Sequence, residues 1–139
     1  MSVAQSLVGT WKIDNSESEN LEAYLQAIGM KDDMIERAIQ SEVEVEWKVE
    51  GDQITQFIRA PVKSHSVTFT LNSPFDETLQ GGKVFETTYT EEDGKLVKRQ
   101  IGSPYNCTCS TELIGDQLVE TRTCESSPPV SSVRKMNRV

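Results

Sequence analysis

Apolar and charged residues alternate along much of the chain. Residues 43–50 read Val-Glu-Val-Glu-Trp-Lys-Val-Glu, so every second side chain is apolar and each one between is charged. Such alternation is typical of a β-strand that buries one face and exposes the other to water. The turn pair Gly51-Asp52 follows, and the alternation resumes over residues 53–59 and 65–71. This part of the chain predicts strands joined by short hairpin turns.

Turn residues divide the rest of the chain at regular intervals. They stand at Gly81-Gly82, Asp93-Gly94, Gly102-Ser103-Pro104, Gly115-Asp116 and residues 126–129. Many short strands joined by short turns indicate an antiparallel meander, which removes its exposed edges by closing into a barrel. Because aromatic residues make up only 6% of the chain and no long apolar helix could fill the interior, we expect the barrel to enclose a cavity.

One region has helical spacing instead. Residues 16–28 carry apolar side chains at steps of three and four and end at Gly29, a common helix stop. A second segment, residues 31–39, has two aspartates in its first turn, where the helix dipole favours negative charge. We therefore expect a helix-turn-helix pair over about residues 16–39.

Length and charge limit the kinds of molecule that this chain is expected to bind. The 139 residues suit a single domain, and 22 acidic against 14 basic residues give a formal net charge of -8. This acidity disfavours nucleic-acid binding and strong docking on anionic membranes. No apolar run approaches the roughly 20 residues that span a bilayer, and the N-terminus lacks the pattern of an export signal. These features predict a cytoplasmic protein.

The chain has few residues of the types that catalyse reactions or bind metals. The cysteines, Cys107, Cys109 and Cys124, are odd in number and are expected to stay reduced. Their spacing does not match a zinc site, and the single histidine, His65, is expected at the surface or at a portal. No nucleophile, base and orienting residue stand at any motif spacing. We therefore predict no enzyme activity, no metal and no cofactor.

Three segments together resemble one known family. Leu7-Val8-Gly9-Thr10-Trp11-Lys12 is similar to its first-strand signature, residues 21–29 are similar to its first helix, and Phe75-Asp76-Glu77-Thr78 matches a motif at its fifth strand. Over nearly the whole chain, the order of these segments resembles that of the intracellular lipid-binding proteins, which include the fatty-acid-binding and cellular retinoid-binding proteins. The resemblance implies a mainly β fold, a ten-stranded antiparallel up-and-down β-barrel of flattened clam shape with a helix-turn-helix lid.

The headgroup site that the resemblance implies is altered in this chain. In the family, a ligand carboxylate usually meets two arginines and a tyrosine near the end of the chain. Arg134 keeps one arginine, whereas Met136 stands at the tyrosine position and Thr111 at the other arginine. The standard clamp for a fatty acid is therefore not assumed.

Pairing outward from the turn at Gly115-Asp116 brings in other polar residues. It sets Thr111 opposite Glu120 in an antiparallel ladder. The resemblance turns Glu120 and Arg122 inward and sets Arg122 across from Arg134, so that Arg122 would replace the arginine missing at Thr111. Alternatively, a register slip of one residue would send Glu120 and Arg122 into solvent.

Further lining residues follow from the same resemblance. Lys98 and Gln100 occupy positions that the family turns inward, and an outward orientation stays open for both. Asp76 and Glu77 are interpreted as structural turn carboxylates. The apolar wall of the cavity is expected to include alternating strand residues: Val45, Ile54, Ile58, Val67 and Phe69.

These features predict a monomeric cytoplasmic carrier of a long-chain fatty acid or a similar amphipathic lipid. Arg134 and Arg122 would hold the head, and the apolar wall would hold the tail. Two alternatives stay open. One is a carrier of a retinoid, a sterol-like acid or an uncharged lipid, and the other is a barrel that serves as a protein-interaction module.

Overall fold

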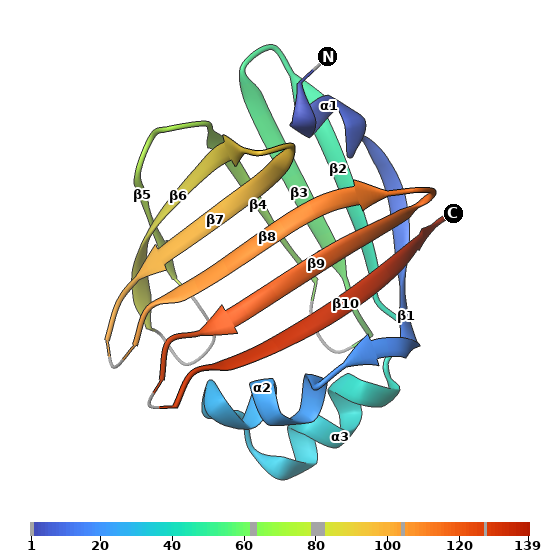
Figure 1. The fold of residues 1–139 in the computed structure, drawn as a ribbon, viewed down its shortest axis with the longest axis vertical. Helices are drawn as coiled ribbons and strands as arrows, with labels where there is room; N and C mark the ends of the chain where they lie inside the picture. Colours follow the sequence, from blue (N-terminus) through green and yellow to red (C-terminus); the bar gives the residue numbers. More distant parts are fainter. Residues whose placement is uncertain (1, 62–63, 79–82, 104, 127) are drawn as a thin grey trace.

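The computed structural model describes residues 2–61, 64–78, 83–103, 105–126 and 128–139. These residues form three helices: α1 (Val3–Ser6), α2 (Leu21–Ala27) and α3 (Asp32–Gln40). They also form ten strands: β1 (Gly9–Glu19), β2 (Glu44–Glu50), β3 (Gln53–Arg59), β4 (His65–Thr70), β5 (Phe75–Thr78), β6 (Val84–Glu92), β7 (Lys95–Ile101), β8 (Cys107–Ile114), β9 (Gln117–Cys124) and β10 (Val130–Arg138). The predicted ten-stranded antiparallel barrel with a helical lid is confirmed (Figure 1).

The sheet closes through its first and last strands. Each strand pairs with its neighbours in sequence, except that β1 also pairs with β10 and that no ladder among the described residues joins β4 to β5. The gap there is bridged by aromatic side chains, because the Phe69 ring of β4 stacks on the Tyr89 ring of β6 and lies parallel to the Phe75 ring of β5. The expected removal of all strand edges is therefore only partly correct.

The lid begins later than the apolar spacing suggested. Strand β1 continues to Glu19, which pairs with Val133, and the Ser132 hydroxyl donates to the Glu19 carbonyl oxygen at 2.9 Å. Asn20 then takes a left-handed conformation with φ 57°, and the helix α2 starts at Leu21. The prediction of a helix from residue 16 was wrong because residues 14–20 are all polar and offer no apolar face to a helix.

A short helix that the sequence interpretation missed covers the end of the barrel opposite the lid (Figure 1). At the start of α1, the Ser2 hydroxyl accepts from the Gln5 backbone N–H, and the Gln5 side-chain oxygen accepts from the Ser2 backbone N–H. This capping box is the one that Ser-x-x-Gln spacing predicts. Leu7 is fully buried behind the helix, and its carbonyl oxygen accepts from the Trp11 indole at 2.9 Å. This end is thus closed by packed side chains.

Two apolar clusters lie at opposite ends of the interior. The larger lies toward the closed end and contains these buried residues: Ala4, Leu7, Trp11, Ile13, Val45, Trp47, Ile54, Phe69, Tyr89, Leu96, Leu118 and Met136. The smaller joins the lid to the barrel and contains Tyr24, Leu25, Ile35 and Cys124. Of the predicted apolar wall, Val45, Ile54 and Phe69 are buried, and Ile58 and Val67 are half-buried.

The register of the last strands decides where the charged residues lie. Thr111 lies opposite Glu120, as predicted, but Arg134 also lies opposite Glu120, and Arg122 faces Ser132. The prediction of Arg122 across from Arg134 was wrong by two residues. Strand β10 begins as early as Val130, whose side chain packs against the lid cluster. A shift of two residues keeps the same side chains inside.

Gly102, which directly follows β7, provides a test of the packing of the chain against Phe85 of β6. A Cβ at this position would lie 1.7 Å from Cδ1 of Phe85, whose side chain is buried. We expect Gly102→Ala to lower the free energy of unfolding by about 1–3 kcal/mol, measured by urea denaturation, because the ring must move in a packed environment. The double variant with Phe85→Leu should lose less than the sum of the single changes. An unchanged urea midpoint for Gly102→Ala would contradict this packing.

Candidate functional site

A cavity of about 900 Å³ lies between the lid helices and the closed-end core. Its wall combines apolar side chains from α2, α3 and the first strands with polar side chains from β5 and β7 to β10. Ligand cavities for small molecules have volumes of roughly 300–1,000 Å³. The interior is therefore large enough for one lipid molecule.

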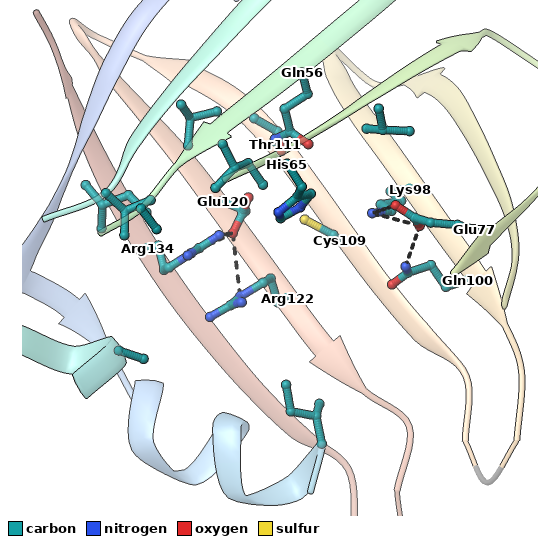
Figure 2. Close-up of a pocket in the computed structure, with 18 of the residues that line it drawn as sticks. Gln56, His65, Glu77, Lys98, Gln100, Cys109, Thr111, Glu120, Arg122 and Arg134 are labelled. Carbon is teal, nitrogen blue, oxygen red and sulfur yellow. Dashed lines mark hydrogen bonds and ion pairs between the residues drawn. The ribbon is translucent and has the colours of Figure 1, made fainter. Parts of the chain in front are cut away.

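Most of the predicted site residues line this cavity. Those that do are Val45, Ile58, Val67, Gln100, Thr111, Glu120, Arg122 and Arg134. The other three, Ile54, Phe69 and Met136, belong to the closed-end core and are not part of the cavity lining. Of the two orientations left open for Glu120 and Arg122, the structure has the inward one (Figure 2).

Glu120 is the centre of the first charged group. Its carboxylate oxygen Oε1 accepts from Arg134 Nε at 2.8 Å and lies 2.6 Å from Arg134 Nη2. The Glu120 side chain is only 6% exposed, and the two residues are direct partners in the β9–β10 ladder. Burial raises the pKa of Glu120, but the nearby Arg134 and Arg122 charges outweigh this effect and leave its pKa below the usual value. Glu120 is therefore an ionised internal counterion for Arg134.

Arg122 is held differently. Its Nε lies 3.5 Å from Glu120 Oε1, and among the described residues neither Nε nor Nη2 has a hydrogen-bond partner although both atoms are buried. The guanidinium stands over the Tyr24 ring of α2, 4.4 Å from its centroid. Burial and the neighbouring Arg134 charge lower the pKa of Arg122, but a guanidinium keeps its proton in proteins. Arg122 is thus a buried cation with unused donors directly under the lid.

A second charged group lies on the other side of the cavity (Figure 2). Lys98 Nζ lies 3.2 Å from Glu77 Oε1, which also accepts from Thr87 Oγ1 at 3.0 Å and from Gln100 Nε2 at 2.9 Å. Lys98 and Gln100 therefore point inward. The interpretation of Asp76 and Glu77 as turn carboxylates was wrong, because both lie within β5, and Glu77 is on the same face as Phe75. The alternation of Phe75 and Glu77 around Asp76 was the signal that could have placed it.

The charges of these groups do not balance. Arg122, Arg134 and Lys98 supply three positive charges, and Glu77 and Glu120 supply two negative ones. The remaining charged residues of the lining, Arg37 and Asp76, are exposed and of opposite sign. Burial raises the pKa of the Cys109 thiol to about 12, so it adds no charge at neutral pH. One positive charge is left over, and Arg122 is the less compensated arginine, because it lies 3.5 Å from Glu120 Oε1 whereas Arg134 Nη2 lies 2.6 Å from the same atom.

The histidine and the three cysteines are the other residues with reactive or metal-binding side chains. His65 is exposed and lines the cavity, in agreement with a portal position. Cys107, Cys109 and Cys124 are free thiols. Within the described part of the chain, no three His, Cys, Asp or Glu side chains gather in a way that could hold a metal ion. None of the helices that the structure describes has the length and apolar character needed to cross a membrane.

The depressed pKa of Glu120 predicts a stability that depends on pH. A carboxyl group whose folded pKa lies below its unfolded value, about 4.3 for glutamate, stabilises the fold fully above that unfolded value. The contribution is lost as the pH falls through the folded pKa. In urea unfolding from pH 7 to pH 3, we expect the stability difference between the parent and Glu120→Gln to narrow below about pH 4.3. A difference that stays constant to pH 3 would contradict the ion pair.

The geometry defines the class of protein. A clam-shaped barrel with a helical lid, one large interior cavity and a buried excess charge is a small-molecule-binding barrel. The chain belongs to the lipocalin / cytosolic fatty-acid binding protein family, whose model matches residues 6–136. The resemblance seen in the sequence is thereby confirmed.

Individual relatives agree with this assignment. Fatty acid-binding protein 1 of Fasciola gigantica is 31% identical over 92% of this chain and 96% of that protein. Fatty acid-binding protein homolog 5 of Caenorhabditis elegans is 34% identical over 85% of this chain and 88% of that protein. Among solved structures, the REP1-NXSQ fatty acid transporter superposes with a TM-score of 0.87 at 26% identity and covers 97% of each chain. The Schistosoma mansoni fatty acid binding protein in complex with arachidonic acid shares the fold, with a TM-score of 0.88 at 23% identity and 99% coverage of each chain.

Proposed function

We propose that this protein is a carrier that binds one long-chain fatty acid, or a similar amphipathic lipid with a single carboxylate, and that the carboxylate is bound by Arg122. The observation that carries the proposal is the guanidinium of Arg122 in a cavity of about 900 Å³, because its buried Nε and Nη2 have no hydrogen-bond partner among the described residues. The names of the relatives, which are fatty acid-binding proteins, support the same class of ligand.

The charge of the cavity favours a monoanion. A buried charge without full compensation is costly, and a ligand carboxylate would supply the missing negative charge together with acceptors for Nε and Nη2 of Arg122. The planar guanidinium suits a carboxylate because it can donate two parallel hydrogen bonds. A ligand with one negative charge would bring the buried charges to balance.

Of the two arginines that the sequence suggested for the headgroup, we propose that Arg122 alone binds the ligand. Arg134 is already neutralised by Glu120 at 2.6 Å, so a ligand would have to displace an internal carboxylate to use it. Arg122 lies nearer the lid and contacts Tyr24 of α2. We therefore place the ligand head beneath the lid, with the tail against the apolar wall, where burial contributes about 25 cal/mol per Å².

The proposal includes a cytoplasmic location and a role without catalysis. Membership in a family described as cytosolic and the free state of all three cysteines support the location. The proposed activity is reversible binding, and the absence of chemistry would be tested by recovering the lipid unchanged after incubation with the protein.

Native mass spectrometry of protein purified from cells, followed by lipid extraction, tests the proposal directly. We expect one lipid acid per protein, and in titrations we expect the acid to bind at least tenfold tighter than its methyl ester. A retinoid or sterol-like acid in the extract would keep the carboxylate site and change the tail class. Equal affinity for acid and ester would instead favour an uncharged lipid. The absence of any lipid, together with a captured protein, would favour an interaction module.

The lid predicts how the ligand is delivered to membranes. Helix α3 carries exposed acids at Asp32, Asp33 and Glu36 against one base, Arg37. Anionic headgroups would repel this surface, so we expect transfer of a fluorescent fatty acid to phosphatidylcholine vesicles not to speed up when phosphatidylserine is added. The variant Asp32→Lys/Asp33→Lys should transfer several-fold faster to the anionic vesicles. Acceleration of the parent protein by phosphatidylserine would contradict the prediction.

A further inference from the structure

The second charged group of the cavity is rich in unused hydrogen-bond acceptors. Glu77 Oε1 accepts from Thr87 and Gln100 and lies 3.2 Å from Lys98 Nζ, whereas among the described residues Glu77 Oε2 accepts only from Lys98, at 3.3 Å. Gln100 donates to Glu77 through Nε2, and its side-chain oxygen is an acceptor. Lys98 is occupied by Glu77 and by the Tyr89 ring, 5.5 Å from its centroid. A carboxylate and an amide oxygen have sites left for a donor.

These acceptors face the cavity at a defined distance from Arg122. In the ladders, Lys98 lies opposite Cys109, and Cys109 lies opposite Arg122, so the three residues form one row across β7, β8 and β9. Two strand spacings separate the Cα atoms of Lys98 and Arg122 by roughly 10 Å. A fatty acid whose head is bound at Arg122 would therefore carry the middle of its tail past Glu77 and Gln100.

An unsubstituted alkyl tail would make an unfavourable contact with Glu77, Lys98 and Gln100. It would remove water from Glu77 and Lys98, whose side chains are 13% and 18% exposed, and would offer no hydrogen bond in return. A hydroxyl group can donate to Glu77 Oε2 or to the Gln100 oxygen and restore what the water supplied. A ketone has no proton to donate and would leave the acceptors unused.

We infer that the preferred ligand is a fatty acid with a hydroxyl group in the middle of its tail, which donates to Glu77 or Gln100. This inference rests on the proposed function, because the carboxylate at Arg122 sets the position of the tail. It assigns Glu77 and Gln100 as residues that determine specificity, whereas Arg122 determines affinity for the acid.

Binding of ricinoleic acid and oleic acid, which differ by one mid-chain hydroxyl, tests the inference in the full-length protein. We expect ricinoleic acid to bind about tenfold tighter than oleic acid, and the corresponding mid-chain ketone to bind no tighter than oleic acid. Gln100→Leu should reduce the preference. Glu77→Met/Lys98→Met, which removes both charges together, should abolish it while oleic acid still binds.

The outcomes separate this inference from the proposed function. Equal affinities for ricinoleic and oleic acid, both of them tighter than the methyl esters, would overturn the inference and leave the carboxylate carrier intact. A ketone that binds as tightly as the hydroxyl acid would also overturn it, because the protein would then donate a hydrogen bond to the tail instead of accepting one from it. Failure of both acids to bind would overturn the inference and the proposed function together.

Discussion

Replacing Arg122 with leucine is expected to weaken the binding of a long-chain carboxylate by roughly ten- to a hundredfold, because the charge-assisted hydrogen bonds to the ligand are lost. The methyl ester of the same lipid should bind with nearly unchanged affinity, since Nε and Nη2 of Arg122 have no ester partner of comparable strength. Isothermal titration of acid and ester against the parent and the variant measures both effects.

The same substitution should not harm the empty protein. Arg122→Leu removes a buried cation with two unsatisfied nitrogens and leaves Glu120 paired with Arg134 alone, so the remaining charges balance. We expect the free energy of unfolding of the empty protein to be equal to or higher than that of the parent. This result would separate a role in binding from a structural one.

Arg99→Leu is the matched control for Arg122→Leu. Arg99 lies on the outer face of β7, pairs with Glu92, and has a side chain that is 50% exposed. Its loss should change neither the affinity for the acid nor the ratio of acid to ester. If both arginine variants lose the acid preference equally, or if Arg122→Leu retains it, Arg122 is not the headgroup residue.

The main features of the fold could be predicted from the sequence because each depends on local pattern. The alternation over residues 43–50 became β2 (Glu44–Glu50), and the turn at Gly115-Asp116 set the β8–β9 register correctly. The start of α2 was misplaced because a polar run such as residues 14–20 has no periodicity to read, and its strand form depends on hydrogen bonds to β10. Elements fixed by distant partners are not visible in local spacing.

The candidate site was harder to predict than the fold. Strand alternation put Glu120 and Arg122 on one face, and the family resemblance turned that face inward, but their partners depended on where β10 begins. Glu77 was missed because its partners, Lys98 and Gln100, stand more than twenty positions away in the sequence. Met136 was expected at the headgroup because of its position in the family pattern, yet its side chain packs in the closed-end core. An ion pair between strands of a barrel can be predicted only when the registers of several strands are known together.

From these contacts we expect Glu120 to act on both stability and binding. The carboxylate holds Arg134 at hydrogen-bond distance and lies 3.5 Å from Arg122, so it occupies space between the two arginines that a ligand carboxylate would need in order to contact both. It stabilises the empty protein by separating two like charges. We also expect it to lower the attraction of the proposed site for an incoming anion, since its own charge partly neutralises Arg122.

Glu120→Gln should therefore move stability and affinity in opposite directions. Breaking a buried ion pair leaves Arg134 and Arg122 as uncompensated neighbours, and we expect the empty variant to lose about 3 kcal/mol of unfolding free energy at pH 7. The same change should tighten a carboxylate ligand by about tenfold, because two cations are then available to it. The ester should gain nothing. Bound acid should restore much of the lost stability, since a ligand stabilises the state it binds by mass action.

Thermal and urea unfolding with and without the fatty acid, together with titrations of acid and ester, measure the two changes in one variant. Glu112→Gln is the matched control, because Glu112 lies on the outward face of β8, 3.7 Å from Lys95, where a surface pair contributes at most about 1 kcal/mol. The control should leave both the stability and the acid affinity close to those of the parent. If Glu120→Gln weakens the acid, the carboxylate positions Arg122 for the ligand, and competition between Glu120 and the ligand is ruled out. If the empty variant is as stable as the parent, the ion pair with Arg134 does not hold this end of the barrel together.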